Sequence, residues 1–455
     1  MTTVAVQHLL KSFEPFQSID IYGEITKIHG LVIIASCHHR DVFVGAFVTC
    51  FKNSHTHYGE VVALEEGQAH IFLASSIQGL SIGDSLQYHQ TPFSISPSID
   101  WKGRVFNAFG HVIDNKPQPL LGSVSTPTKS PPPPALLRAP VKEPLDVGIR
   151  AMNLFTTACK GQRLGIFAGS GVGKSVLLSM LARFTACDIC IIGLIGERGR
   201  EVREFLDDTL GKDGCKKSIL VVATSDEPPL ARRQAAYTTL SIAEYFRDQG
   251  YNVLCMIDSL TRFAMAQREI GLFTGEPPTT KGYPPSTFVE LAQLCERAGP
   301  GIDTIHNPHG SLHVPEKQNG TITGMFSVLV DGDDHNEPIA DAVRGILDGH
   351  IVLDRALAER GIYPAIHILK SISRLATKAQ TPHQRNLSLQ AKKILSVYDD
   401  MRDLIRLGAY KEGSHKEVDH AIALYPAFEH LLTQYYDDQT SLDDSFEQLE
   451  KILTS

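Results

Sequence analysis

Residues Ala168 to Ser175 read AGSGVGKS, and they stand between the apolar run LGIF and the helix-like stretch VLLSMLARF. A glycine-rich turn between a strand and a helix exposes consecutive backbone N–H groups, and the helix N-terminus adds the positive end of its dipole. In such a turn the lysine, here Lys174, reaches the β and γ phosphates, and the hydroxyl of Ser175 ligates magnesium. Ala168 replaces the usual first glycine, a position that needs only a small side chain. The stretch therefore predicts a phosphate-binding loop.

The sequence around this loop alternates between strand-like and helix-like segments from about Leu145 to Arg374. The strand-like runs are LGIF, CIIGLIG, ILVVAT, VLCMID and MFSVLV, and helical stretches such as AAYTTLSIAEYFRDQG separate them. This alternation is typical of βα units around a mostly parallel sheet. We therefore expect an α/β core.

Different patterns flank the core. Short β-branched runs broken by glycine, from about Ile19 to Gln90, predict a small β-barrel or sandwich. The proline-rich STPTKSPPPP, Ser125 to Pro134, favours an extended connector. After Arg374, apolar residues at three-to-four-residue steps predict helices. We expect three domains: a β-barrel over 1–97, a linker with the α/β core over 98–376, and a helical domain over 377–455.

Composition excludes several classes of function. A chain of 455 residues with a net charge of -8 and a pI near 6.2 lacks the basic face that a broad nucleic-acid footprint needs, so no nucleic-acid partner is expected. No apolar run approaches the roughly 18 to 20 residues of a membrane-spanning helix. The amino terminus lacks the features of a signal peptide. Eight cysteines without framework spacing indicate reduced thiols, and we expect a cytoplasmic protein.

Two carboxylates follow predicted core strands. Asp258 ends the run NVLCMI, which places it at the carboxyl edge of the sheet, where ligands of open α/β sheets bind. There it suits a magnesium-water partner; the alternative is a helix N-cap before SLTRF. Glu197 follows CIIGLIG and could polarise an attacking water, while Glu201 could join the outer shell of the metal. The alternative for the GERGREV stretch is a solvated charged turn.

With these pieces in place, the chain resembles the catalytic subunits of rotary ATPases and, more closely, the type III export ATPases, with the flagellum-specific ATPases as the best match. The resemblance rests on GQRLGIFAGSGVGKSVLL, GERGREV, ATSDEPPLARRQAA, IAEYFRDQGYNVLCMIDSLTRFAMAQREIG, GEPPTTKGYPPSTF, LVDGDDHNEPIADAVRGILDGHIVLDR and YPAIHILKSISR. These stretches span most of 161–374. The resemblance implies a RecA-like P-loop ATPase core with an N-terminal β-barrel and a C-terminal helical domain.

The resemblance also implies residue roles. Glu197 is the catalytic carboxylate that activates water, Arg198 contacts the γ-phosphate, and Lys174 completes the catalytic set with Arg374, an arginine finger inserted into the neighbouring protomer's site. Tyr363 matches the aromatic residue that packs on adenine; its alternative is an ordinary core tyrosine. The residues implied to bind magnesium are Ser175, Glu201 and Asp258. The residues implied to bind ATP are Gly169, Ser170, Gly171, Val172, Gly173, Lys174, Ser175, Val176 and Tyr363.

The partners implied by the resemblance are those of a protein-export machine. They are five further copies of the chain in a homo-hexamer, a stator-like regulator, a central coiled-coil stalk protein, the membrane export gate, and export substrates with their chaperones. ATP and Mg²⁺ are the implied cofactors. The protein is then cytoplasmic, with peripheral association to the inner-membrane flagellar export apparatus.

Three alternatives stay open at this point. An ATPase of a virulence type III injectisome shares nearly every motif. A hexameric RNA translocase also places a small barrel before a RecA-like domain, but needs basic and aromatic residues on that barrel. A non-catalytic ring subunit would lack the phosphate-loop lysine or the catalytic acid. The chain also departs from the family in GIDTIHNPHGSLHVPEKQNG (301–320), where His306, His309 and His313 favour a mobile loop over a zinc site. We expect His38, His39, His55 and His57 in exposed barrel loops.

Overall fold

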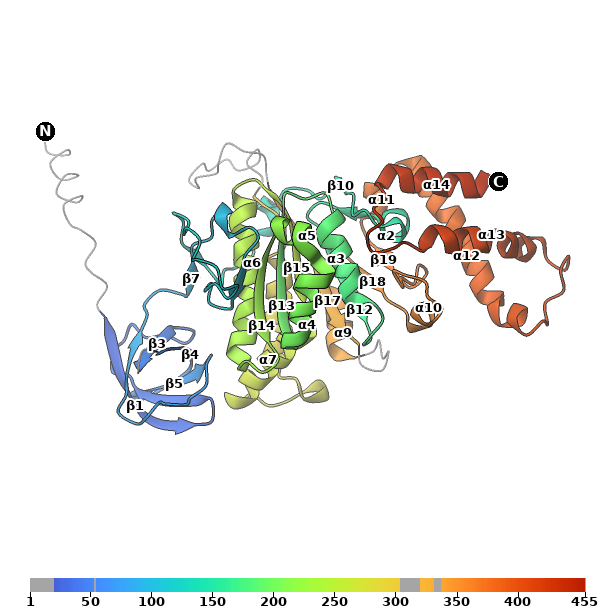
Figure 1. The fold of residues 1–455 in the computed structure, drawn as a ribbon. Coiled ribbons are helices and arrows are strands. Elements are labelled where there is room, and N and C mark those ends of the chain that lie inside the picture. The colour runs from blue at the N-terminus through green and yellow to red at the C-terminus, as the bar shows by residue number, and fades with distance from the viewer. Residues whose placement is uncertain (1–19, 53–54, 303–319, 331–336, 455) are drawn as a thin grey trace, which may run out of the picture.

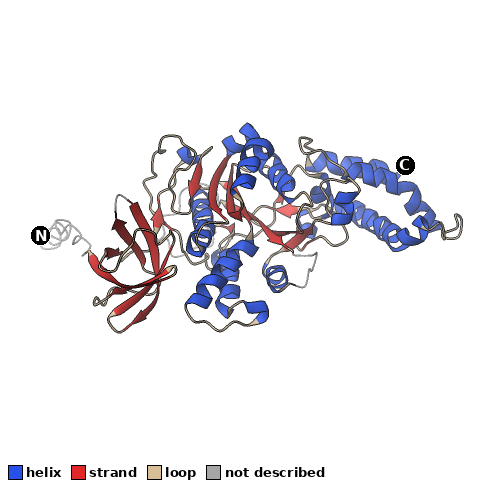
Figure 2. Ribbon diagram, turned by 60° about the horizontal axis from the view of Figure 1, so that its bottom comes forward, coloured by secondary structure: helices blue, strands red, loops and turns tan. Residues whose placement is uncertain are grey.

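The computed structural model describes residues 20–52, 55–302, 320–330 and 337–454, and the histidine-containing segment 303–319 lies outside them. Three parts follow one another along the molecule: a small barrel, a central sheet covered by helices, and a group of helices at the carboxyl end (Figure 1). This arrangement confirms the predicted fold class. Figure 2 shows the same division by type, with only strands in the barrel and a long helical hairpin in the carboxyl-terminal part.

The amino-terminal part is a closed barrel with the strand order β1-β2-β5-β4-β3-β6. Its strands are β1 (Ile21–His29), β2 (Val32–Ser36), β3 (Phe47–Lys52), β4 (His55–Glu65), β5 (Gln68–Leu73) and β6 (Ser85–Tyr88). Closure leaves no strand edge unpaired, and alternate residues fill the interior. The loop expectation for His55 and His57 is wrong, because both lie on β4, whose pattern of alternating burial turns His57 inward. His38 and His39 lie in the exposed segment after β2.

The central part is a nine-stranded sheet with the path β19-β18-β12-β17-β15-β13-β14-β8 and β16 paired to β17. Its strands are β8 (Val105–Asn107), β12 (Arg163–Ala168), β13 (Ile189–Glu197), β14 (Ser218–Thr224), β15 (Asn252–Asp258), β16 (Gly299–Pro300), β17 (Thr321–Leu329), β18 (Gly349–Val352) and β19 (Ile372–Ser373). The pairs from β18 to β8 are parallel. All five strands predicted from the apolar runs are present. Their carboxyl ends meet at one edge of the sheet.

Helices cover both faces of this sheet (Figure 1). The helices of the central part are α2 (Arg150–Phe155), α3 (Lys174–Phe184), α4 (Gly199–Glu204), α5 (Gly211–Lys217), α6 (Pro229–Asp248), α7 (Leu260–Phe273), α8 (Pro285–Glu296), α9 (Pro338–Ile346), α10 (Arg355–Glu359) and α11 (Ala376–Ala379). Two separate apolar cores result. One joins the sheet to α6, α7 and α8, and the other joins it to α2, α3 and the carboxyl-terminal helices.

The proline-rich connector is extended, as predicted, but it is held against the core. Its residues Thr126–Pro127 form β9, which pairs with β7 (Ser94–Ile95). The buried guanidinium of Arg297 donates to the carbonyl oxygen of Thr128 at 2.8 Å and forms an ion pair with Glu244. The first of these bonds gives the buried carbonyl of Thr128 a hydrogen-bond partner. The connector is therefore held against α6 and the end of α8 instead of acting as a free linker.

The carboxyl-terminal part consists of α12 (Pro382–Arg406), α13 (Lys416–Leu432) and α14 (Leu442–Thr454). The predicted helical spacing is confirmed for α12 and α14. Thr381 and Gln384 form a capping box at the start of α12, which satisfies two backbone N–H groups of its first turn. The pattern did not single out α13, which carries Pro426 in its interior. No helix in the described part of the chain combines the length and the apolar character that crossing a membrane requires.

Candidate active site

The phosphate-binding loop predicted from AGSGVGKS joins the end of β12 to the start of α3. Gly171 and Gly173 have φ angles of 76° and 92°, in the left-handed region where residues with a Cβ are strained. A Cβ on Gly173 would also lie 3.3 Å from the ring of Tyr363. Glycine at this position therefore lets the loop turn into the helix with an aromatic ring directly beside it.

Lys174, the first residue of α3, reaches across to two carboxylates at the ends of neighbouring strands. Its amino group contacts the carboxylate of Asp258, at the end of β15, and lies 3.5 Å from Glu197 Oε1, at the end of β13. Burial favours the neutral amine, but the two carboxylates outweigh it and raise the pKa of Lys174 above its ordinary value. The lysine is therefore a fixed cation at the carboxyl edge of the sheet.

Asp258 is almost fully buried, with 4% of its surface exposed. The hydroxyl of Ser327, on β17, donates to its Oδ1 at 2.6 Å. The N-cap alternative for Asp258 is wrong, because the next residue, Ser259, caps α7 by accepting from the backbone N–H of Arg262. The carboxylate of Asp258 is thus free of helix capping and faces Lys174.

Glu197 has the properties of a proton acceptor that works near neutral pH. Burial is the main cause that raises its pKa, to about 7, with the Lys174 cation opposing the shift and the Asp258 charge adding to it. Its Oε1 is buried and makes no hydrogen bond. A carboxylate with this pKa is partly ionised at neutral pH and can accept a proton from water. The solvated-turn alternative does not fit Glu197.

A cavity of about 130 Å³ brings several of the predicted residues together. Its lining includes Ser175, Glu197, Glu201 and Asp258. The oxygen atoms of Ser175, Glu201 and Asp258 are donors of the kind that Mg²⁺ prefers. Across the described ranges, no three His, Cys, Asp or Glu side chains lie close enough to form a metal cage by themselves. Phosphate oxygens and water are the ligands that would complete the shell of a cation in this cavity.

The other predicted residues, Arg198, Tyr363 and Arg374, lie outside the lining of this cavity. Arg198 has 75% of its side chain exposed and pairs with Glu201 at 3.6 Å. Tyr363 is 41% exposed, which excludes the core-tyrosine alternative. Arg374 is exposed after β19, and its guanidinium donates to the carbonyl oxygen of Arg344 at 3.1 Å. Arg374 does not line the cavity of its own chain.

Two residues at the site escaped the sequence analysis. Ser327 holds Asp258, and its only signal is a hydroxyl inside the apolar strand MFSVLV. Arg355, the first residue of α10, donates to the carbonyl oxygen of Ser170 in the phosphate-binding loop at 3.1 Å. The two residues of this bond are 185 positions apart, so no local pattern could reveal it.

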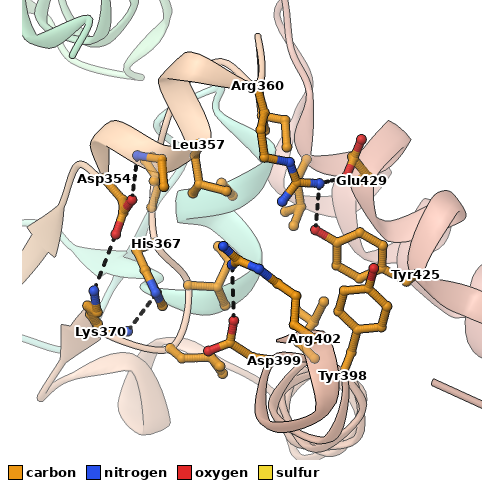
Figure 3. Close-up of a pocket in the computed structure, with 18 of the residues that line it drawn as sticks. Asp354, Leu357, Arg360, His367, Lys370, Tyr398, Asp399, Arg402, Tyr425 and Glu429 are labelled. Atoms are coloured by element: carbon orange, nitrogen blue, oxygen red, sulfur yellow. Dashed lines mark hydrogen bonds and ion pairs between the residues drawn. The ribbon is translucent and has the colours of Figure 1, made fainter. Parts of the chain in front are cut away.

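A second cavity, of about 320 Å³, separates residues 354–370 from the carboxyl-terminal helices (Figure 3). Arg360 spans it and bonds Glu429 at 2.5 Å and the Tyr425 hydroxyl at 3.2 Å. Tyr425 stacks on Tyr398 with ring centroids 3.6 Å apart. Tyr363 does not line this cavity, although its two chain neighbours do. The contacts tie the carboxyl-terminal helices to the chain segment that carries Tyr363.

The family and sequence similarities of this chain agree with the fold and the site described above. The family model described as "ATP synthase alpha/beta family, nucleotide-binding domain" matches residues 148–373, and the model "T3SS EscN ATPase C-terminal domain" matches residues 380–451. The chain is 51% identical to the flagellum-specific ATP synthase of Caulobacter vibrioides, covering 99% of this chain and 100% of the relative. It is 45% identical to that of Bacillus subtilis, covering 97% and 98%.

A solved structure shows the same architecture. The assembled ATPase EscN from the type III secretion system of enteropathogenic E. coli superposes with a TM-score of 0.84 at 38% identity, covering 95% of this chain and 100% of EscN. EscN in complex with its central stalk EscO gives the same TM-score at 39% identity. Fold and site thus define a P-loop ATPase of the ATP synthase alpha/beta type. More particularly, the chain belongs to the family of flagellum-specific ATP synthases.

Proposed function

We propose that the chain hydrolyses ATP to ADP and phosphate at the Lys174 site and that hydrolysis drives or facilitates the export of flagellar proteins. The observation that carries the proposal is the meeting of Lys174, Glu197 and Asp258 at the phosphate-binding loop, in a chain of this family. An arriving triphosphate replaces the carboxylates as the partner of Lys174. Glu197 is then released to accept a proton from the attacking water.

We propose that Mg²⁺ accompanies the nucleotide, held by Ser175 and by water molecules on Glu201 and Asp258. The three oxygen donors line one cavity, and the buried Oε1 of neighbouring Glu197 has no hydrogen bond there. When bound, the cation neutralises charge on the phosphates. Because the cavity lacks a complete ligand cage in the described residues, the cation would bind with the nucleotide and not before it.

The nucleotide contacts proposed from the motif extend along the loop and beyond it. They are the backbone N–H groups and side chains of Gly169, Ser170, Gly171, Val172, Gly173, Ser175 and Val176. Tyr363, exposed beside Gly173, would stack on the adenine. Arg198, exposed at the start of α4, would contact the γ-phosphate. The exposed guanidinium of Arg198 offers the positive charge that a phosphate contact needs. The exposed ring of Tyr363 offers the flat apolar surface that stacking on adenine needs.

We further propose a homo-hexamer in which Arg374 reaches the phosphate site of the adjoining protomer. EscN is described as assembled and as complexed with a central stalk, and its likeness supports a ring with a stalk for this chain. We also propose that the chain works with a stator-like regulator, the membrane export gate, and export substrates with their chaperones, and that it associates peripherally with the membrane.

We place the domain boundaries at 97/98 and 376/377. The last strand of the barrel ends at Tyr88, and the first family match ends at residue 373 while the second begins at residue 380.

The injectisome alternative keeps one specific observation in its favour, the fold likeness to EscN over 95% of the chain. The flagellar assignment is preferred, because the flagellum-specific relatives reach 51% identity against 38% for EscN. Complementation separates the two: the gene should restore motility to a strain lacking its flagellar export ATPase. Restored effector secretion without motility would favour the injectisome.

The proposed role of Arg374 predicts rescue between two inactive variants. Arg374→Ala and Lys174→Ala should each abolish most turnover, but mixed rings should regain activity. In a random equal mixture about a quarter of the interfaces pair an intact Lys174 with an intact Arg374. The measurement is steady-state ATP hydrolysis, with native mass spectrometry to establish that subunits of both variants share one ring. Mixed rings that stay inactive would assign Arg374 a role within its own chain.

A further inference from the structure

We propose that Gly196 is a positioning residue that turns the Glu197 carboxylate onto the nucleotide face of the sheet. The inference rests on the proposed role of Glu197 as the base. Gly196 precedes Glu197 on β13, an interior strand that lies between β14 and β15 (Figure 1). The geometry on both sides of this glycine carries the argument.

Side chains of β13 alternate between two apolar cores. Ile191 and Ile195 share a core with helix α6, whereas Ile192 and Leu194 share a core with helix α3. Strict alternation would send Glu197, two residues after Ile195, to the α6 face. That face contains no phosphate-binding loop. Unbroken alternation would therefore place the carboxylate on the wrong side of the sheet.

The structure places Glu197 on the α3 face. Its Oε1 lies 3.5 Å from Lys174 Nζ, and its cavity is also lined by Leu194, Val202 and Phe205, which all belong to the α3-side core. The alternation of β13 is therefore reversed between Ile195 and Glu197.

The reversal coincides with an extra residue in the strand ladder. Ile195 pairs with Ala223 of β14, but the next pair is Glu197 with Thr224, so Gly196 has no partner in that register. Gly196 has a φ of 69°, in the left-handed region typical of a glycine bulge. After the bulge, the backbone N–H of Ser225 donates to the carbonyl oxygen of Glu197 at 3.0 Å. The inserted residue thus changes the face of Glu197, the residue with which β13 ends.

A second contact makes glycine necessary at this position. A Cβ on Gly196 would lie 2.8 Å from Arg262 Cβ and 2.9 Å from its Cγ. Arg262 belongs to α7, and its stem packs directly over the bulge. Any other residue must therefore displace that stem as well as adopt a left-handed backbone.

Three substitutions separate the bulge from the packing contact. Gly196→Asn, Gly196→Ala and Gly196→Val all introduce a Cβ against Arg262, but they differ in tolerance of positive φ, in the order Asn, Ala, Val. We expect the loss of kcat to be smallest for Asn, larger for Ala and largest for Val, which should be at least about tenfold below the parent. The ATP affinity of all three variants should stay within about threefold of the parent value. We expect Asn and the parent to keep a fall in kcat/KM below about pH 7, because Glu197 still acts, and Val to lose it.

The control is Gly193→Ala on the same strand, whose Cβ would lie 2.5 Å from Thr239 Oγ1 without changing the register. It should lower the melting temperature and leave the pH profile of kcat/KM unchanged. If Gly196→Val does not fold, the comparison of kcat between Gly196→Asn and Gly196→Ala decides by itself. The inference would be overturned if kcat of Gly196→Asn were no higher than that of Gly196→Ala, or if Gly196→Val were fully active. An active Glu197→Gln variant would instead overturn the proposed function, so the two failures are distinguishable.

Discussion

Lys174→Ala is expected to lower ATP turnover by about 100- to 1,000-fold, because it removes the cation aimed at the charge that develops on the transferred phosphoryl group. The same change leaves Asp258 and Glu197 facing each other in a buried site without their shared partner. Nucleotide affinity should fall together with kcat. Steady-state hydrolysis and the binding of a fluorescent ATP analogue measure the two effects.

Lys160→Ala is the matched control for this variant. The substitution removes the same charge from the same domain. Unlike Lys174, Lys160 pairs at the surface, with Glu143 at 2.9 Å. Surface pairs of this kind contribute about 0–1 kcal/mol, so turnover should stay near the parent value. Near-normal hydrolysis in Lys174→Ala, with loss in neither variant, would rule out the phosphate-binding role of the loop.

Glu197→Gln is expected to keep ATP binding and to lose about 100- to 10,000-fold in kcat, since the amide has the same shape but cannot accept the proton. The pH profile gives a second readout. Because the pKa of Glu197 is raised to about 7 in the nucleotide-free protein, kcat/KM of the parent enzyme should fall as the pH falls through 7 and the carboxylate becomes protonated. The residual activity of the variant should not show this fall.

Glu143→Gln, at the surface, is the isosteric control for that change. It should leave both kcat and the pH profile of kcat/KM unaltered. A loss of only twofold in Glu197→Gln would assign the base to another residue. The next carboxylate to examine would then be Glu201, which lines the same cavity.

Local sequence patterns predicted the fold well, because each element has its own signal. The glycine-rich loop, the five apolar strand runs and the helical spacing of α12 and α14 depend on residues close together in the chain. The motif and the strand end also placed Lys174 and Asp258 at the same edge of the sheet, although the direct contact between them was not predicted.

The details of the site that escaped prediction all depend on long-range packing or on a break in a pattern. Ser327 supports Asp258 from a strand 69 positions away in sequence. The bulge at Gly196 reverses an alternation that the sequence would extend to Glu197. The wrong assignment of His55 and His57 to loops has a similar cause, because polar residues on a barrel strand give no local sign of being paired.

The central claim is that two adjoining copies jointly enclose one triphosphate, the first binding and attacking it and the second supplying Arg374. The most direct test is the specific rate of ATP hydrolysis measured against protein concentration, with the mass of the particles determined in parallel. The account predicts that the rate per chain rises with assembly and that isolated protomers are nearly inactive. A rate per chain that stays constant from monomer to ring would contradict it.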